Sequence, residues 1–214
     1  MHLFIVRHGE CDAQVTHDSD PDSPLDALGR RQSLLVGAAL VRHGVTAISA
    51  SPLVRALETA QIVASVLKLP TVAVWPDLRE HYTARHRGHD TATLRRYCPL
   101  ARFPADVTVD GWDHGGDTPV SSRARCARAI GRVRHEYGDE GRVALLTHGG
   151  CANTLVHVLL DLPPGATSFF ELANGALHHF RLVPERERLR DPFYPPFAVE
   201  IHAVNDTGHL RAGR

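Results

Sequence analysis

The chain has 214 residues, of which 43% are hydrophobic and 22% charged, which is enough apolar material for a real core. Lys plus Arg and Asp plus Glu number 24 each, so bulk charge does not point to nucleic acid or a membrane surface as a partner. The four cysteines are scattered without a C-x-x-C pair, and no apolar stretch has the length of a signal peptide or a membrane span. We therefore expect a soluble, cytoplasmic protein.

Short apolar runs alternate with longer stretches of helical periodicity along the chain. Asp26 predicts a helix cap, and Ser51-Pro52 and Thr118-Pro119 each predict a helix start, a cap followed by proline. The helix after Asp26 is expected to bury a face formed by Leu28, Leu34, Leu35, Ala38 and Ala39. The predicted strands are 3–6, 45–50, 72–75, 142–147, 176–183 and 197–203, and the predicted helices run from Asp26, Ser51, Thr118 and Gly149 to about residues 42, 67, 137 and 160.

Residues 83–118 break this alternation, since they contain prolines, glycines and histidines without a clear period. They are predicted to form a largely irregular excursion with one helix near 91–97. Elsewhere the alternation of strands and helices predicts an α/β fold, a three-layer α/β/α sandwich with a mainly parallel sheet. The sequence has no repeats or linkers, so one domain over 1–214 is the economical prediction.

Three polar clusters follow predicted strands: Arg7-His8-Gly9-Glu10, Ser51-Pro52-Leu53-Val54-Arg55 and Thr147-His148-Gly149-Gly150. Ligands bind beyond the carboxyl ends of the strands in such sheets, and two of the clusters also begin helices, whose N-termini favour anions. Two arginines and two histidines should therefore meet at one point. Arginine forks match phosphate oxygens, and a neutral imidazole can attack phosphorus, so the expected ligand is a phosphoryl group.

These motifs resemble those of the histidine phosphatase superfamily, the branch with cofactor-dependent phosphoglycerate mutases and many phosphatases. The resemblance rests on R-H-G-E, S-P-L-x-R-A-x-E-T-A and T-H-G-G in this order. Weaker fragments extend it over nearly the whole chain: Asp26-x-Leu28-Gly29-x-x-Gln32, Gly116-Asp117-Thr118 with Arg125, and Asn205-Asp206 with His209-Leu210. The resemblance implies a phosphoglycerate mutase-like fold.

The resemblance also implies roles for individual residues. His8 would attack phosphorus, while Arg7, Arg55 and His148 would bind the phosphoryl oxygens and stabilise the transition state, with Gly149 beside them in the substrate site. Glu80 stands where many relatives carry the general acid, and Gln14 where some carry a phosphate-contacting asparagine. Asp77, Glu10 and Asp117 are competing carboxylates for the acid role. We expect no cofactor and no metal, because the spacing of His81, His86, His89 and Asp90 fits no standard ligand pattern.

The segment after the acid differs from that of the relatives. Mutases typically read E-R-H-Y-G, whereas this chain reads Glu80-His81-Tyr82-Thr83, and the W-E-G of many small phosphatases is absent. Loss of the arginine favours a phosphatase acting on a phosphorylated small molecule, with a mutase as the alternative and a phospho-ligand binding module as the minor one. The Arg- and His-rich excursion is expected to rim the pocket and select an anionic substrate. A homodimer through the late strand with Phe197, Val199 and Ile201 is a further hypothesis.

Overall fold

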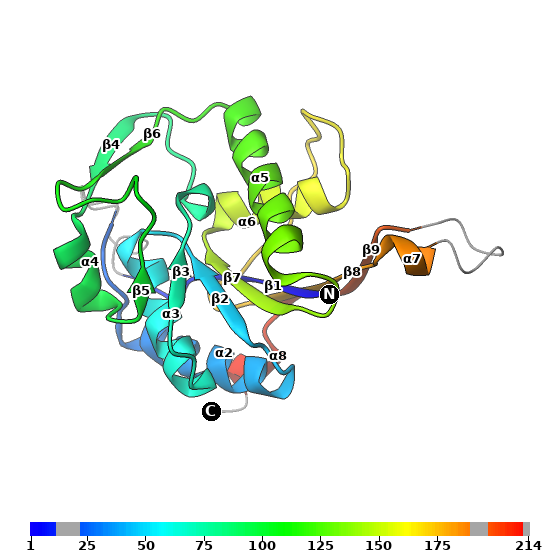
Figure 1. Cartoon of the computed structure of the whole chain (residues 1–214), viewed down its shortest axis with the longest axis horizontal. Helices are drawn as coiled ribbons and strands as arrows, with labels where there is room; N and C mark the ends of the chain where they lie inside the picture. The colour runs from blue at the N-terminus through cyan, green and yellow to red at the C-terminus, as the bar shows by residue number, and fades with distance from the viewer. Residues whose placement is uncertain (12–21, 189–196, 212–214) are drawn as a thin grey trace.

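The computed structural model describes residues 1–11, 22–188 and 197–211, and its centre is a mixed, mostly parallel sheet of seven strands (Figure 1). The strand order is β5-β3-β2-β7-β1-β8-β9. The first five strands run parallel: β5 (Ala101–Arg102), β3 (Val72–Val74), β2 (Ala47–Ala50), β7 (Arg142–Thr147) and β1 (His2–Arg7). β8 (Leu177–Leu182) and β9 (Val199–Asp206) add antiparallel pairings.

Helices cover both faces of this sheet, which confirms the predicted three-layer α/β/α sandwich. Phe4 and Val6 of β1 belong to the core under α2 (Ala27–Arg42) and α3 (Val54–Leu67). Leu3 and Ile5, which point to the opposite face, belong to the core under α5 (Pro119–Tyr137) and α6 (Gly149–Leu159). Shorter helices complete the fold: the 3-10 turn η1 (Pro76–Leu78), α4 (Thr91–Tyr97), α7 (Glu185–Arg188) and α8 (Gly208–Arg211).

The predicted caps locate most of the helix starts. Asp26 Oδ1 accepts a hydrogen bond from Gly29 N (2.6 Å), as expected for an N-cap. Thr118 and Ser121 form a reciprocal capping box, with Pro119 in the first turn. α3 starts later than predicted, at Val54, since Ser51 lies before the helix and its Oγ accepts from Leu53 N (3.2 Å).

The predicted buried face of α2 was only partly right. Ala39 is buried as predicted, but Leu28 and Leu34 are 54% and 53% exposed, and the other residues turned inward include Gly29, Ser33 and Gly37. Gly29 lies against the loop after β1, where an added Cβ would be 2.0 Å from the carbonyl oxygen of Glu10. Close approach of two backbones therefore decides which face is inside, and an apolar periodicity cannot show it.

The excursion at 83–118 is more ordered than predicted. The helix near 91–97 is confirmed as α4, but β4 (Arg85–Gly88) and β6 (Trp112–Gly115) pair as an antiparallel two-stranded sheet. β5 joins the edge of the main sheet beside β3. The prediction of a largely irregular segment was wrong because strands of two to four residues carrying Arg, His and Gly show no apolar alternation.

The last strand lies at the edge of the sheet, next to β8 only. Phe197 and Ile201 are 50% and 54% exposed there, and the homodimer stays a prediction. Among the described residues, no helix is both long enough and apolar enough to cross a bilayer.

Candidate active site

The carboxyl ends of three neighbouring strands bring the predicted site residues together. β1 and β7 are parallel and in register, with Arg7 paired to Thr147, so His8 and His148 follow side by side. β2 lies on the other side of β7 and ends just before Ser51. Arg55 is the second residue of α3, and Gly149 is the first residue of α6. The site thus combines the loop that follows β1 with the starts of the two helices that follow β2 and β7.

The imidazole of His8 is buried and held in one orientation. Its Nδ1 lies 2.7 Å from the carbonyl oxygen of Gly9, which can only accept, so Nδ1 carries the proton. Nε2 therefore carries the lone pair, which accepts a hydrogen bond from Arg55 Nε at 3.1 Å. Burial lowers the pKa of His8 well below its usual range, and the Arg55 guanidinium adds to this. His8 accordingly presents a neutral nitrogen nucleophile toward a guanidinium.

The backbone around His8 is fixed by a residue that the sequence did not indicate. Asn174 Nδ2 donates to the carbonyl oxygens of His8 (3.1 Å) and Gly9 (3.2 Å). Gly9 N donates in turn to Thr59 Oγ1 (3.2 Å) on α3. Asn174 was not predicted as a site residue. Its contact with His8 spans 166 positions of the sequence, and no local pattern indicates it.

Arg55 connects the nucleophile to the rest of the pocket. Only 6% of Arg55 is exposed, and its Nη2 donates to Tyr82 Oη (3.0 Å) while its Nη1 lies 3.8 Å from Asp22 Oδ1. Glu58, one turn further along the same helix, accepts from Arg30 Nε (2.7 Å). Tyr82 was not predicted as a site residue, although it lies only two positions after Glu80.

His148 and Arg7 complete the polar floor of the site. The rings of His8 and His148 have centroids 5.1 Å apart, and His148 Nε2 lies 2.8 Å from Ser51 Oγ. Burial lowers the pKa of His148 well below its usual range, with Arg55 contributing. Arg7 Nη1 donates to the carbonyl oxygen of Leu172 (2.7 Å), and a Cβ added at Gly149 would be 3.5 Å from Arg7 Nε. The first residue of α6 therefore lies beside the guanidinium, at a distance of ordinary van der Waals contact.

Glu80 lies at the N-terminus of α6. Its Oε1 accepts from the backbone N of His81 (2.9 Å) and of Cys151 (3.0 Å), and its Oε2 accepts from Gly150 N (3.1 Å). Each carboxylate oxygen can accept two hydrogen bonds, so Oε2 keeps a position for a proton. The Glu80 charge also acts on Arg7, as the leading electrostatic interaction of that guanidinium. Glu80 is thereby within the field of the phosphate-binding groups.

Arg125 holds the segment that carries Glu80. It is 1% exposed, and its Nη1 donates to the carbonyl oxygens of Asp77 (2.8 Å) and Arg79 (2.7 Å). Its Nη2 donates to the carbonyl oxygen of Glu80 (3.3 Å) and also contacts His81 Nδ1. The guanidinium of a residue on α5 thus fixes the orientation of the acid, a role the sequence signalled only as a family fragment.

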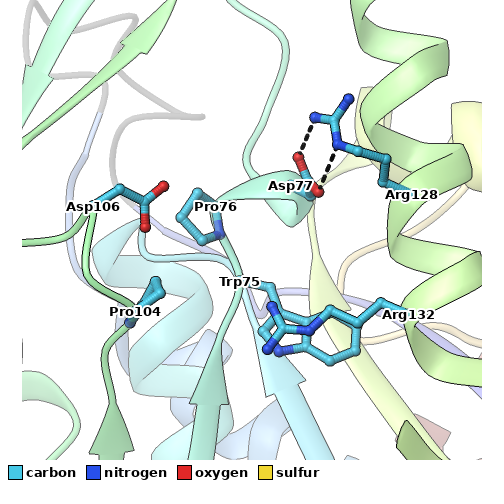
Figure 2. Close-up of a pocket in the computed structure, with 7 residues that line it drawn as sticks. All are labelled: Trp75, Pro76, Asp77, Pro104, Asp106, Arg128 and Arg132. Carbon is cyan, nitrogen blue, oxygen red and sulfur yellow. Dashed lines mark hydrogen bonds and ion pairs between the residues drawn. The ribbon is translucent and has the colours of Figure 1, made fainter. Parts of the chain in front are cut away.

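Two of the three competing carboxylates are occupied elsewhere. Figure 2 shows Asp77 pointing to Arg128, whose Nη2 lies 2.7 Å from Asp77 Oδ1. Asp117 accepts from Arg79 Nη2 (2.8 Å) and is 3.4 Å from Arg125 Nε. Glu10 remains an alternative to Glu80, because its charge acts on Arg7 as well.

The surface cavity beside Asp77 is distinct from the His8 site. It has a volume of about 310 Å³, and the Arg132 guanidinium covers the Trp75 ring there at 4.2 Å (Figure 2). None of the residues that resemble the family motifs lines it. Its lining is Trp75, Pro76, Asp77, Pro104, Asp106, Arg128 and Arg132.

Three residues considered above as metal ligands have different partners within the protein. His81 Nε2 contacts Thr154 Oγ1 (2.9 Å), His86 packs against aromatic rings of the excursion, and Asp90 caps α4 by accepting from Thr93 N (2.8 Å). Within the part of the chain that the structure describes, no three His, Cys, Asp or Glu side chains form a group able to hold a metal ion. Gln14, the predicted phosphate contact, lies outside the described residues.

Several known proteins are similar to this chain in sequence or in fold. The uncharacterized phosphatase PhoE of Bacillus subtilis is 26% identical over 191 residues, covering 88% of this chain and 92% of its own length. The probable phosphoglycerate mutase GpmB of Yersinia enterocolitica is 30% identical over 215 residues, covering 98% and 95%. The crystal structure of phosphoserine phosphatase from Entamoeba histolytica with 3-phosphoglyceric acid shares the fold at 21% identity, with a TM-score of 0.68 and 98% of each chain covered.

The family itself follows from a match over most of the length. The family model of the histidine phosphatase superfamily (branch 1) matches residues 3–192, which include the strand ends and helix starts described above. The chain belongs to the histidine phosphatase superfamily, branch 1.

Proposed function

We propose that this protein is a phosphatase that hydrolyses a small phosphomonoester through a phosphohistidine on His8. The observation that carries the proposal is the fixed tautomer of His8, with Nδ1 bound to the Gly9 carbonyl and Nε2 facing Arg55 at 3.1 Å. A neutral nitrogen next to a guanidinium is suited to attack a phosphoryl group whose oxygens the same guanidinium binds. Arg7, His148 and Gly149 are proposed to bind the remaining oxygens.

In the first step, His8 Nε2 forms a bond to phosphorus while the bond to the ester oxygen breaks. Glu80 donates its proton to the departing oxygen, which leaves as an alcohol. In the second step, the Glu80 carboxylate accepts a proton from water, and the resulting hydroxide attacks phosphorus and breaks the P–N bond. Inorganic phosphate leaves, and both His8 and Glu80 return to their starting states. Arg55 and Arg7 stabilise charge on the phosphoryl oxygens throughout.

A mutase is the second candidate, since the GpmB relative is named as one. A mutase must bind a second phosphorylated alcohol and exclude water from the phosphohistidine. The position after the acid is His81, whose ring contacts Arg125 and Thr154, so it is not available as a cation for a substrate carboxylate. This supports the simpler outcome, in which water is the acceptor. The chain is proposed to act as one domain whose 83–118 segment selects the substrate.

The test is phosphate release from a panel of phosphomonoesters at mildly acidic to neutral pH, with the wild type and His8→Ala compared. The proposal predicts release by the wild type and loss of release, by roughly 10⁴-fold or more, in His8→Ala. Release that survives in His8→Ala would exclude the phosphohistidine mechanism. Interconversion of phosphoglycerates without net release would favour the mutase, and binding of phosphorylated ligands without any turnover would favour a binding module.

A further inference from the structure

Some arginines in and next to the excursion have partners within the protein. Arg79 pairs with Asp117 (2.8 Å), Arg87 pairs with Asp113 (2.8 Å), and Arg95 covers the ring of Phe103 (5.0 Å). Two of these charges are therefore paired with carboxylates, and the third lies over an aromatic ring.

Four aromatic rings contact one another in and next to the excursion. Tyr82, His86, Trp112 and His114 form this aromatic wall. Tyr82 and His86 meet edge to face with centroids 4.9 Å apart, His86 and His114 stack at 5.3 Å, and Trp112 and His114 stack at 4.4 Å. The pairing of His86 opposite His114 across β4 and β6 sets this order. Trp112 is fixed against the backbone, since a Cβ at Gly88 would lie 2.1 Å from its Nε1.

One guanidinium joins the aromatic wall to the phosphate site. Arg55 donates through Nε to His8 Nε2 (3.1 Å) and through Nη2 to Tyr82 Oη (3.0 Å). A phosphoryl group bound at His8 and Arg55 therefore places its ester oxygen close to Tyr82. Tyr82 and His86 are only half-buried, whereas Trp112 and His114 are 3% and 6% exposed behind them. The wall thus has a half-buried front layer and a buried back layer.

The back layer is uncharged at neutral pH. Burial, with His86 beside it, lowers the pKa of His114 to about 4, so its imidazole is neutral. The buried rings of Trp112 and His114 therefore offer no charge to a carboxylate or a second phosphate. The aromatic wall suits a flat group, because aromatic faces and edges attract one another at these separations.

We infer that the physiological substrate is a phosphomonoester whose alcohol carries a planar ring, which packs against Tyr82 and His86 of the aromatic wall. This inference rests on the proposed phosphatase function and names the class of its substrate. The phosphoryl group lies between His8 and Arg55, and the ring extends from the ester oxygen along the inner face of the β4–β6 sheet. The ring is thereby recognised by shape and stacking, and charge recognition is confined to the phosphate.

The test compares benzyl phosphate with cyclohexylmethyl phosphate, two primary alkyl esters that differ in whether the ring is flat. Their ratio of kcat/KM is independent of the fraction of active enzyme, so partial unfolding of a variant does not change it. We expect the wild type to prefer benzyl phosphate by roughly three- to tenfold, from the usual strength of ring stacking. His86→Leu should bring the ratio near one, and His86→Phe, which keeps a flat ring, should retain it. His89→Leu, the same change at an exposed histidine of the same loop, is the matched control and should retain the ratio.

The outcomes separate the two levels of the proposal. Hydrolysis of both esters at equal efficiency by the wild type would overturn the planar-ring inference and leave the phosphatase function intact. A preference for benzyl phosphate that His86→Leu does not reduce would overturn the assignment to the aromatic wall. Absence of hydrolysis with every ester tested would overturn the proposed function and the inference with it.

Discussion

The imidazole rings of His8 and His148 lie with centroids 5.1 Å apart, and each is held by hydrogen bonds to its neighbours. His8 Nδ1 is held by the Gly9 carbonyl, and His148 Nε2 by the Ser51 hydroxyl. Burial lowers the pKa of both rings, so two adjacent histidines can remain neutral without repelling each other. The residue-scale consequence is a nucleophile that does not need to lose a proton before it reacts.

The role of Glu80 is tested by varying the leaving group. Glu80→Gln removes the proton donor, so kcat/KM with benzyl phosphate, which reports phosphoryl transfer to His8, should fall by roughly 10²–10⁴-fold, the usual contribution of general acid catalysis. With p-nitrophenyl phosphate, whose leaving oxygen needs little protonation, the fall should be far smaller. The measurement is kcat/KM for both esters in each variant. Asp77→Asn serves as control, because Asp77 is paired to Arg128 and faces the separate cavity.

Equal losses with the two esters would contradict general acid catalysis by Glu80. Such a result would leave Glu10, whose charge also acts on Arg7, as the carboxylate to test next. A reduced loss with p-nitrophenyl phosphate in Asp77→Asn as well would show that the assay does not distinguish the acid from its surroundings.

At the scale of elements, α2 packs closely against the loop after β1 because Gly29 has no side chain. A Cβ there would lie 2.0 Å from the carbonyl oxygen of Glu10, in the loop that follows His8. We predict that Gly29→Ala destabilises the protein by at least about 1–3 kcal/mol, the usual cost of overpacking. The measurement is the free energy of unfolding in urea, together with kcat, since the His8 loop must move as well.

The matched control for Gly29→Ala is Gly131→Ala in α5. Gly131 is exposed in mid-helix, and an added Cβ would meet nothing within 4 Å. Because alanine is the better helix former, this change should stabilise the protein by roughly 0.5–1 kcal/mol. Similar effects of the two substitutions would show that close backbone approach at Gly29 does not position α2.

The elements with strong local signals could be predicted from the sequence, and those without them could not. α5 is delimited by its Thr118-Pro119 start and β7 by an apolar run, and both lie where the sequence placed them. β4 and β6 are short and polar, and they pair through contacts that no local period encodes. Their pairing still decides which side chains of the excursion face Arg55.

The site residues divide in the same way, into those that the sequence predicts and those that it does not. Arg7, His8, Arg55 and His148 follow strand ends, so topology alone predicts that they meet. Tyr82, Asn174 and Arg125 reach the site from distant segments, and the bond from Arg125 to Glu80 spans 45 positions. The sequence indicated Arg125 only as part of a family fragment, and it did not indicate Tyr82 or Asn174 as site residues. The sequence predicts that His8 is the nucleophile, whereas the orientation of its ring is seen only in the structure.

At the scale of the whole molecule, buried histidines make stability depend on pH. Burial lowers the pKa of His178 to about 4, and its Nδ1 accepts from Asn205 N (2.9 Å), which joins β8 to β9. The unfolded chain takes up the proton near pH 6.5. Between these values the unfolded state binds more protons, so the free energy of unfolding falls as pH falls. The stabilisation that neutral His178 contributes is fully present above pH 6.5 and is lost as the pH drops toward 4.

We therefore predict that unfolding in urea becomes easier as the pH is lowered from 6.5 to 4.5. In His178→Leu, the slope of the free energy of unfolding against pH should decrease by up to about 1.4 kcal/mol per pH unit, the value for one proton. The absolute stability should also fall, because Asn205 N loses its acceptor. A slope unchanged by His178→Leu would show that this histidine is not neutral in the folded state.

The central claim is that phosphorus becomes bonded to His8. The direct measurement is rapid mixing of the enzyme with benzyl phosphate, an alkaline quench that preserves phosphohistidine, and mass spectrometry of the peptide containing residue 8. The account predicts a transient phosphoryl group on His8 that disappears as inorganic phosphate is released. Phosphate release with no phosphoryl group on His8 at any time, or with one on another side chain, would contradict it.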